Sequence, residues 1–153
     1  GIQQVIVVGG PMAVSTAVLA ALRADGVSVL RVAGPTAGAT AAALAGLETA
    51  SAGSHQGFGW DHHSAGFGVA RGNGYQDGLA GAALLGRGFR GSGPVPLLLT
   101  ASPTTLGQGL VSFLHRVGTR GVGSPPTPVS FLLVLGGPDA VSPALVQAMA
   151  GAL

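Results

Sequence analysis

Residues Val5–Gly10 read VIVVGG, a run of β-branched residues followed by two glycines. Short continuous apolar runs of this kind are typical of strands that are buried on both faces, as in parallel sheets. The pattern continues to Ser15, and residues Leu132–Ser142 repeat it without a gap. In both copies a strand ends in Gly-Gly-Pro and a serine precedes a helix, so the glycines are expected to turn the chain sharply off the strand end. The repeat therefore predicts two equivalent strand–turn–helix units.

Strand and helix patterns alternate along the whole chain. The expected strands are Gln4–Val8, Val27–Val32, Gly66–Ala70, Pro96–Thr100 and Phe131–Leu135. The expected helices are Thr16–Ala24, Ala37–Ala50, Tyr75–Gly86 and two that begin at Ser102-Pro103 and Ser142-Pro143. Alternation of this kind predicts an α/β fold of three layers, with a mostly parallel, Rossmann-like sheet and helices on both faces.

Composition narrows the class of protein. The 153 residues suit a single module, and only 8% are charged, with seven arginines, five acids and no lysine. Low charge on an apolar chain excludes disorder, and no apolar run is long enough to span a membrane. A net charge of +2 with scattered arginines argues against nucleic acid as a partner. The absence of cysteine excludes disulfides and cysteine metal sites, and no cofactor is expected.

These motifs, taken in order, resemble the cell wall-binding repeat 2 family of Gram-positive bacteria. Both copies of the strand–Gly-Gly–Ala-Val-Ser pattern are similar to the end of a family module. Arg31–Pro35 and Thr40–Ala42 are similar to the segment that opens one, although Thr36–Gly38 replaces its Asp-Arg-Tyr. Val69–Ala80 is similar to the family's central motif, which is followed by a leucine-rich strand such as Pro96–Thr100.

The resemblance implies a Toprim-like module in a secreted, cell-surface protein. It divides residues 1–153 into 1–29, similar to the closing unit of a preceding repeat, and 30–153, one full repeat. Family modules occur in threes and hold a protein non-covalently on an anionic cell-wall polymer. The resemblance therefore implies a wall polymer as partner, together with neighbouring repeats or a homo-oligomer, a trimer or larger. We expect a chain that begins at Gly1 to be a processed chain or a piece of a longer one.

Five residues are candidates for contact with such a polymer. Helix starts and loops at the carboxyl edge of an open α/β sheet are where ligands bind. The candidates are Arg31, Arg71, Asn73, Tyr75 and Asp77. Arg71 could hold a phosphate or carboxylate with two hydrogen bonds, or it could pair with Asp77. Asp77 could instead stabilise the start of its helix. Gly9-Gly10-Pro11 lacks the spacing of a phosphate loop and is interpreted as a tight turn.

A second group of candidates lies in the loop from Ser51 to Ser64. Trp60, His62 and His63 are a possible interface with a neighbouring subunit, since tryptophan is a frequent anchor there. Three histidines with Asp61 could also hold zinc or nickel, but adjacent histidines rarely point at one ion, so no metal site is expected. Stacking of Trp60 on a sugar ring is a further option.

Catalysis is not expected. The chain has no Gly-x-Ser-x-Gly elbow, and a single Glu with no Asp-x-Asp does not support a Toprim-type metal centre. The leading hypothesis is a non-catalytic wall-binding module. The alternative is a self-assembling structural subunit of a surface layer or filament, because a mean hydropathy of +0.55 suggests further buried surface. A nucleotide-binding enzyme rests on fold analogy alone.

Overall fold

Strands and helices alternate in the computed structural model, which describes residues 1–51, 57–60, 65–89, 93–123 and 125–153. The elements are β1 (Gln4–Val8), α1 (Thr16–Ala24), β2 (Ser28–Val32), α2 (Ala37–Glu48), β3 (Ala65–Arg71), α3 (Gln76–Arg87), β4 (Leu97–Thr100), α4 (Gln108–Arg120), β5 (Val129–Val134) and α5 (Pro143–Gly151). The expected α/β class is confirmed. Within the described residues, no helix is both long and apolar enough to cross a membrane.

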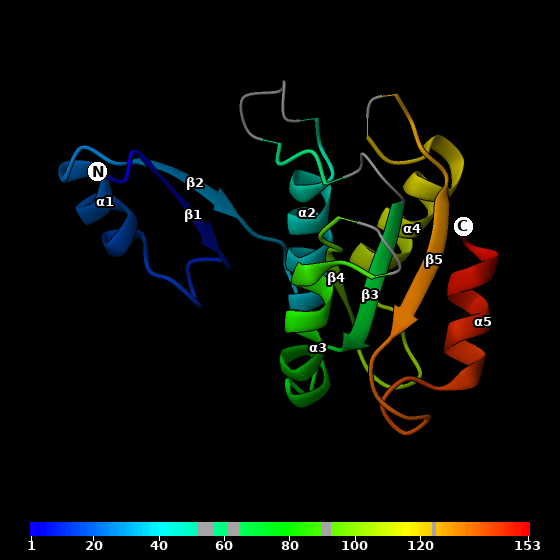
Figure 1. Ribbon diagram of the computed structural model, residues 1–153. Helices are drawn as coiled ribbons and strands as arrows, with labels where there is room; N and C mark the ends of the chain where they lie inside the picture. Colours follow the sequence, from blue (N-terminus) through cyan, green and yellow to red (C-terminus); the bar gives the residue numbers. More distant parts are fainter. Residues whose placement is uncertain (52–56, 61–64, 90–92, 124) are drawn as a thin grey trace.

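The strands form two separate parallel sheets. β1 pairs with β2, whereas β3 lies between β4 and β5 in a second sheet. Figure 1 shows β1, α1 and β2, here called the N-terminal unit, to one side of a larger body that contains α2 to α5. Parallel neighbours cannot be joined by a hairpin, so a helix crosses between strands each time. This requirement explains the alternation seen in the sequence.

Helices cover both faces of the body's sheet. Successive side chains of a strand point to opposite faces. Phe67 and Val69 of β3 are fully buried in the core cluster that α4 and α5 complete, and the Phe67 ring meets Phe113 of α4 edge-on at 5.2 Å between centroids. Gly68 points the other way, where a Cβ would collide with Leu85 of α3. The expected three layers are therefore present.

The two strand–turn–helix units fold alike. Gly9 and Gly136 have φ of 118° and 100°, which other residues rarely adopt. In the first turn the Ala13 and Val14 amides both donate to the carbonyl of Gly10. In the second turn the equivalent amides, those of Ala140 and Val141, donate to the carbonyl of Gly137. The repeat in the sequence is thus also a repeat in backbone geometry.

The expected helix start at Ser102-Pro103 is wrong. The Ser102 hydroxyl accepts a hydrogen bond from the Thr104 amide, and Ser102 and Thr105 form an isolated bridge, so this segment closes a turn. Gly107, at φ 81°, then precedes α4, which begins at Gln108. At Ser142 the same residue pair does start a helix, because that hydroxyl accepts from the Leu145 amide.

Candidate functional site

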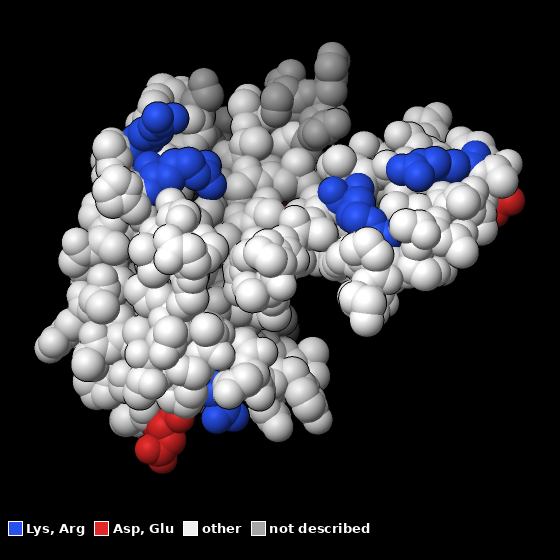
Figure 2. All heavy atoms as spheres, turned by 180° about the vertical axis from the view of Figure 1, so that it is seen from behind, with Lys and Arg blue, Asp and Glu red and all other residues white. Residues whose placement is uncertain are grey.

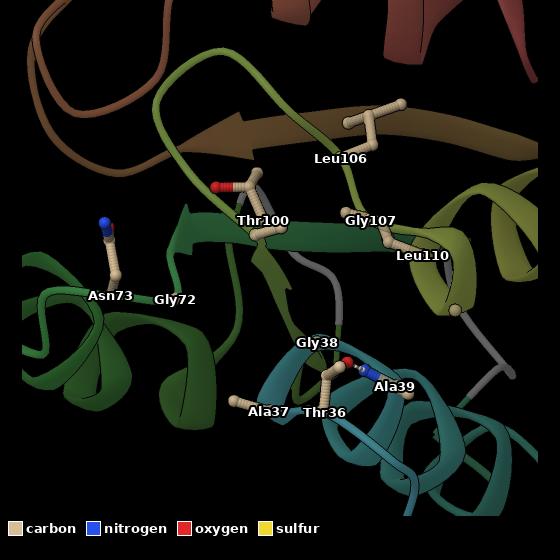
Figure 3. A pocket seen from close by; sticks show the side chains of 12 residues that line it. Thr36, Ala37, Gly38, Ala39, Gly72, Asn73, Thr100, Leu106, Gly107 and Leu110 are labelled. Atoms are coloured by element: carbon tan, nitrogen blue, oxygen red, sulfur yellow. Dashed lines mark hydrogen bonds between the residues drawn. The ribbon is translucent and has the colours of Figure 1, made fainter.

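A hollow of about 210 Å³ lies at the carboxyl ends of β3 and β4, between the starts of α2 and α4 (Figure 3). Thr36 caps α2, because its hydroxyl oxygen accepts from the Ala39 amide at 3.1 Å. Gly72 and Asn73 follow β3, and Thr100 ends β4. This is the edge at which open parallel sheets bind ligands.

Small residues bring the walls of this hollow together. A Cβ on Gly38 would lie 2.7 Å from the carbonyl oxygen of Leu99, and one on Gly109 would lie 2.6 Å from the Cβ of Ala39. Both distances are shorter than real contacts, so glycine is required at each position. The Ala- and Gly-rich composition of α2 therefore serves close packing of α2 against β4 and α4.

Two further hollows adjoin the first along the same edge. One, of about 580 Å³, shares Thr36 and Ala37 with it and extends to residues 8–13 of the N-terminal unit. The other, of about 340 Å³, shares Gly72 and contains Arg71 and Tyr75. The three hollows adjoin one another in a row through Thr36, Ala37 and Gly72, an arrangement that suits an extended ligand better than an enclosed small molecule.

Arg71 carries an unused hydrogen-bond donor in this row. Its Nε is buried and has no hydrogen-bond partner within the described residues. A buried donor without a partner is rare and unfavourable. The Nε is covered by Gly74, where a Cβ would come within 2.8 Å of it, so a ligand would meet the terminal nitrogens of the guanidinium. The Tyr75 side chain beside it is 75% exposed, and that of Leu79, one turn further along, is 71% exposed. Of the five residues predicted for one site, Arg71, Asn73 and Tyr75 line these hollows.

Arg31 lies elsewhere and has partners of its own. Its guanidinium donates to the carbonyl oxygens of Gly9, at 2.5 Å, and Val14, at 2.7 Å. It lines none of the three hollows. The guanidinium joins β2 to the turn after β1, a structural role that the sequence analysis did not foresee.

Asp77 lies against the second strand–turn–helix unit. A Cβ on Gly136 would come within 2.5 Å of the Asp77 Oδ2 atom, so the carboxylate rests on that turn. Within the described part of the chain it forms neither an ion pair with Arg71 nor a hydrogen bond to the Asn73 or Gly74 amides. It keeps the favourable position for an acid in the first turn of a helix, that of α3.

The Trp60 loop is described only in part. The Trp60 amide donates to the carbonyl of Glu48 at 3.0 Å, and its ring packs against Phe58, with 5.6 Å between centroids. His62 and His63 lie outside the described residues, as do His55 and Asp61. Among the described residues there is no cluster of potential metal ligands.

Two features at the opposite end of the body were not predicted from the sequence. Burial raises the pKa of Glu48, the last residue of α2, to about 7. A hollow of about 320 Å³ nearby contains Arg116 and Arg120, one turn apart on α4. The helical spacing could have identified this arginine pair, but the burial of Glu48 depends on tertiary packing. Figure 2, which shows the molecule from behind, has few charged groups on a largely uncharged surface.

Comparison with solved structures shows where this fold occurs. The chain is similar to Cwp8 from Clostridium difficile, at 20% identity and a TM-score of 0.66, and to Cwp6 from the same organism, at 19% and 0.68. These alignments cover 99% and 97% of this chain but 20% of each of those chains. Identity this low shows the shared fold only. No curated protein sequence matches the chain.

A family model gives the more specific result. The model described as Cell wall binding domain 2 (CWB2) matches residues 31–146, which include Arg71, Tyr75 and the hollows between α2, α3 and α4, but not residues 8–13 of the N-terminal unit. The match spans most of the chain, and it agrees with the resemblance carried by the strand, turn and helix motifs. The chain therefore belongs to the cell wall binding domain 2 family.

Proposed function

We propose that this chain is a non-catalytic module that attaches a secreted protein to the bacterial surface by binding an anionic polymer of the cell wall. One observation carries the proposal: within the described residues the Arg71 guanidinium has no hydrogen-bond or ion-pair partner, at an edge lined by helix starts. A guanidinium offers donors in a planar fork that matches a phosphate or carboxylate group. Helix starts favour the same sign of ligand charge.

The surroundings of Arg71 suit a sugar-containing chain. Tyr75 offers an exposed aromatic face, on which the apolar side of a sugar ring can pack. The neighbouring hollow adds backbone groups of Gly72 and the Asn73 side chain. An open row of hollows fits a polymer that lies across the surface.

Substitution of Arg71 tests this site. We expect Arg71→Ala in the full chain to weaken sedimentation with purified cell walls by about tenfold or more, because a charged hydrogen bond is lost. Arg71→Lys should restore part of the affinity, since it keeps the charge but not the fork. Arg87→Ala, at the far end of α3 and outside the row, is the matched control. Equal binding by all four proteins, with unchanged folding, would contradict the proposal.

A self-assembling structural subunit is the second candidate function. It is favoured by exposed apolar side chains on both parts of the molecule, among them Met12, Tyr75 and Leu79, on a chain of which 8% is charged. Such surfaces are often interaction sites. Light scattering behind size exclusion tests it: particles of three or more copies support assembly, and a monomer at all concentrations counts against it.

A further inference from the structure

Within the described residues, the edge of the body's sheet at β5 has no neighbouring strand, and neither has the edge at β4. The strand order is β4-β3-β5, so β5 pairs with β3 alone among the described residues. The Leu135 amide donates to the carbonyl of Val69 on β3, at 2.8 Å. Because backbone groups alternate sides along a strand, the amides and carbonyls of Leu132, Val134 and Gly136 point to the open edge. An open edge is a template for strand addition.

The N-terminal unit shows which strand fits this edge. Val5, Val7 and Gly9 of the first copy correspond to Leu132, Val134 and Gly136 in the repeat. The Gly9 amide donates to the carbonyl of Val32 at 2.8 Å, so this same set of backbone groups holds β2. The edge of β1 that pairs with β2 is thus the equivalent of the open edge of β5.

Arginine completes the docking in the first copy. The Arg31 guanidinium spans the carbonyls of Gly9 and Val14, and a planar fork of donors is needed to reach both. Their equivalents are Gly136 and Val141, in a turn of the same geometry. Within the described residues, no side chain donates to either of these two carbonyls.

Charge at the second turn also favours an arginine. Asp77 places a carboxylate beside Gly136, and Asp139 stands in this turn where the first copy has Met12. Arg31 reaches its own turn without an acid at that position. The second turn therefore offers an incoming arginine at least the same two carbonyls, with negative charge added nearby.

We propose that the open edge of β5 receives a parallel strand of the β2 type, with an arginine at its next-to-last position, from another module of the same kind. The added strand would extend the sheet beyond β5, and its arginine would bind the carbonyls of Gly136 and Val141. The modules would then be joined by continuous sheet as well as by the chain. This surface lies on β5 and is independent of the proposed polymer site around Arg71.

The repeat supplies an exact test. Gly26 corresponds to Leu153, so a copy of Val27–Thr36 appended directly after Leu153 has the spacing found between α1 and β2. We expect hydrogen exchange at the Leu132, Val134 and Gly136 amides to slow by about tenfold or more in the extended chain. Tm should rise by about 3 °C or more. The same extension with its arginine replaced by methionine should give a smaller effect.

A proline variant controls for non-specific stabilisation. The Val134 amide points away from β3, so Val134→Pro removes a donor from the open edge while the β3–β5 pairing remains. In that background we expect the extension to change neither exchange nor Tm. A synthetic peptide of residues 27–36, added to the unextended full chain, gives a second reading at the same three amides. Exchange unchanged at all three in both experiments, or protection equal in the Val134→Pro background, overturns the proposal.

Discussion

Arg31, near the end of β2, and Arg71, at the end of β3, have different environments. Arg31 donates to two carbonyls and so links β2 to the turn after β1. Arg71, at the end of β3, keeps a buried Nε without a partner among the described residues. A guanidinium with fixed partners stabilises the fold, whereas one that lacks a partner is available to a ligand. At this scale the molecule separates its structural arginine from its candidate binding arginine.

The role of Arg31 can be tested by removing its charge. Arg31→Met should lower the stability of the N-terminal unit by about 2 kcal/mol, because two charge-assisted hydrogen bonds are lost. Hydrogen exchange at the Val5 and Val7 amides should become faster, while exchange in β3 should not change. Arg23→Met, on the exposed face of α1, is the control and should have no such effect.

Glu48 makes stability depend on pH. Burial raises its pKa from 4.5 to about 7, so the folded chain binds a proton that the unfolded chain has released at intermediate pH. This stabilisation is fully present below about pH 4.5 and is lost as the pH rises through about 7. We expect a loss of about 1 kcal/mol, since the carboxyl is only partly buried. Denaturant unfolding of Glu48→Gln should lack this pH dependence, and the same slope in both proteins would contradict the assignment.

At the scale of elements, glycine sets how closely α2 approaches its neighbours. Gly109→Ala should destabilise the chain by about 1–3 kcal/mol, because its Cβ would lie 2.6 Å from that of Ala39. Gly46 on α2 is the matched contrast. A Cβ there would meet Arg116 at an ordinary 3.5 Å, so Gly46→Ala should stabilise the helix by about 0.5–1 kcal/mol. Urea unfolding measures both changes, and changes of the same sign would refute the packing argument.

Short sequence motifs predict turns and helix starts well when the residues that follow them favour the same structure. The Gly-Gly-Pro turns and the helix start at Ser142 follow from backbone preferences alone, and both are confirmed. Ser102-Pro103 has the same sequence pattern. There, however, Ser102 forms a bridge with Thr105 and Gly107 has a positive φ, so α4 begins only after Gly107. A Ser-Pro pair is compatible with a turn as well as with a helix start. The residues that follow the pair therefore determine which of the two forms.

At the scale of the whole molecule, the sequence predicts parallel strands but not which strands share a sheet. The alternation of elements indicated one sheet, whereas β1 and β2 form their own. Side-chain roles that depend on strand pairing could therefore not be predicted. The link that Arg31 makes between β2 and the turn after β1 is an example. The grouping of Arg71, Asn73 and Tyr75 could be predicted, because Arg71 ends β3 and the other two residues follow it, so all three reach the same edge.

Binding of the unmodified full chain to cell walls, before and after the anionic polymer is extracted from them, tests the central claim most directly. The account predicts saturable sedimentation with intact walls that weakens as salt rises, because the contact is between opposite charges. It also predicts loss of most binding once the polymer is removed. Equal binding to intact and extracted walls, or no binding to either, would contradict the account.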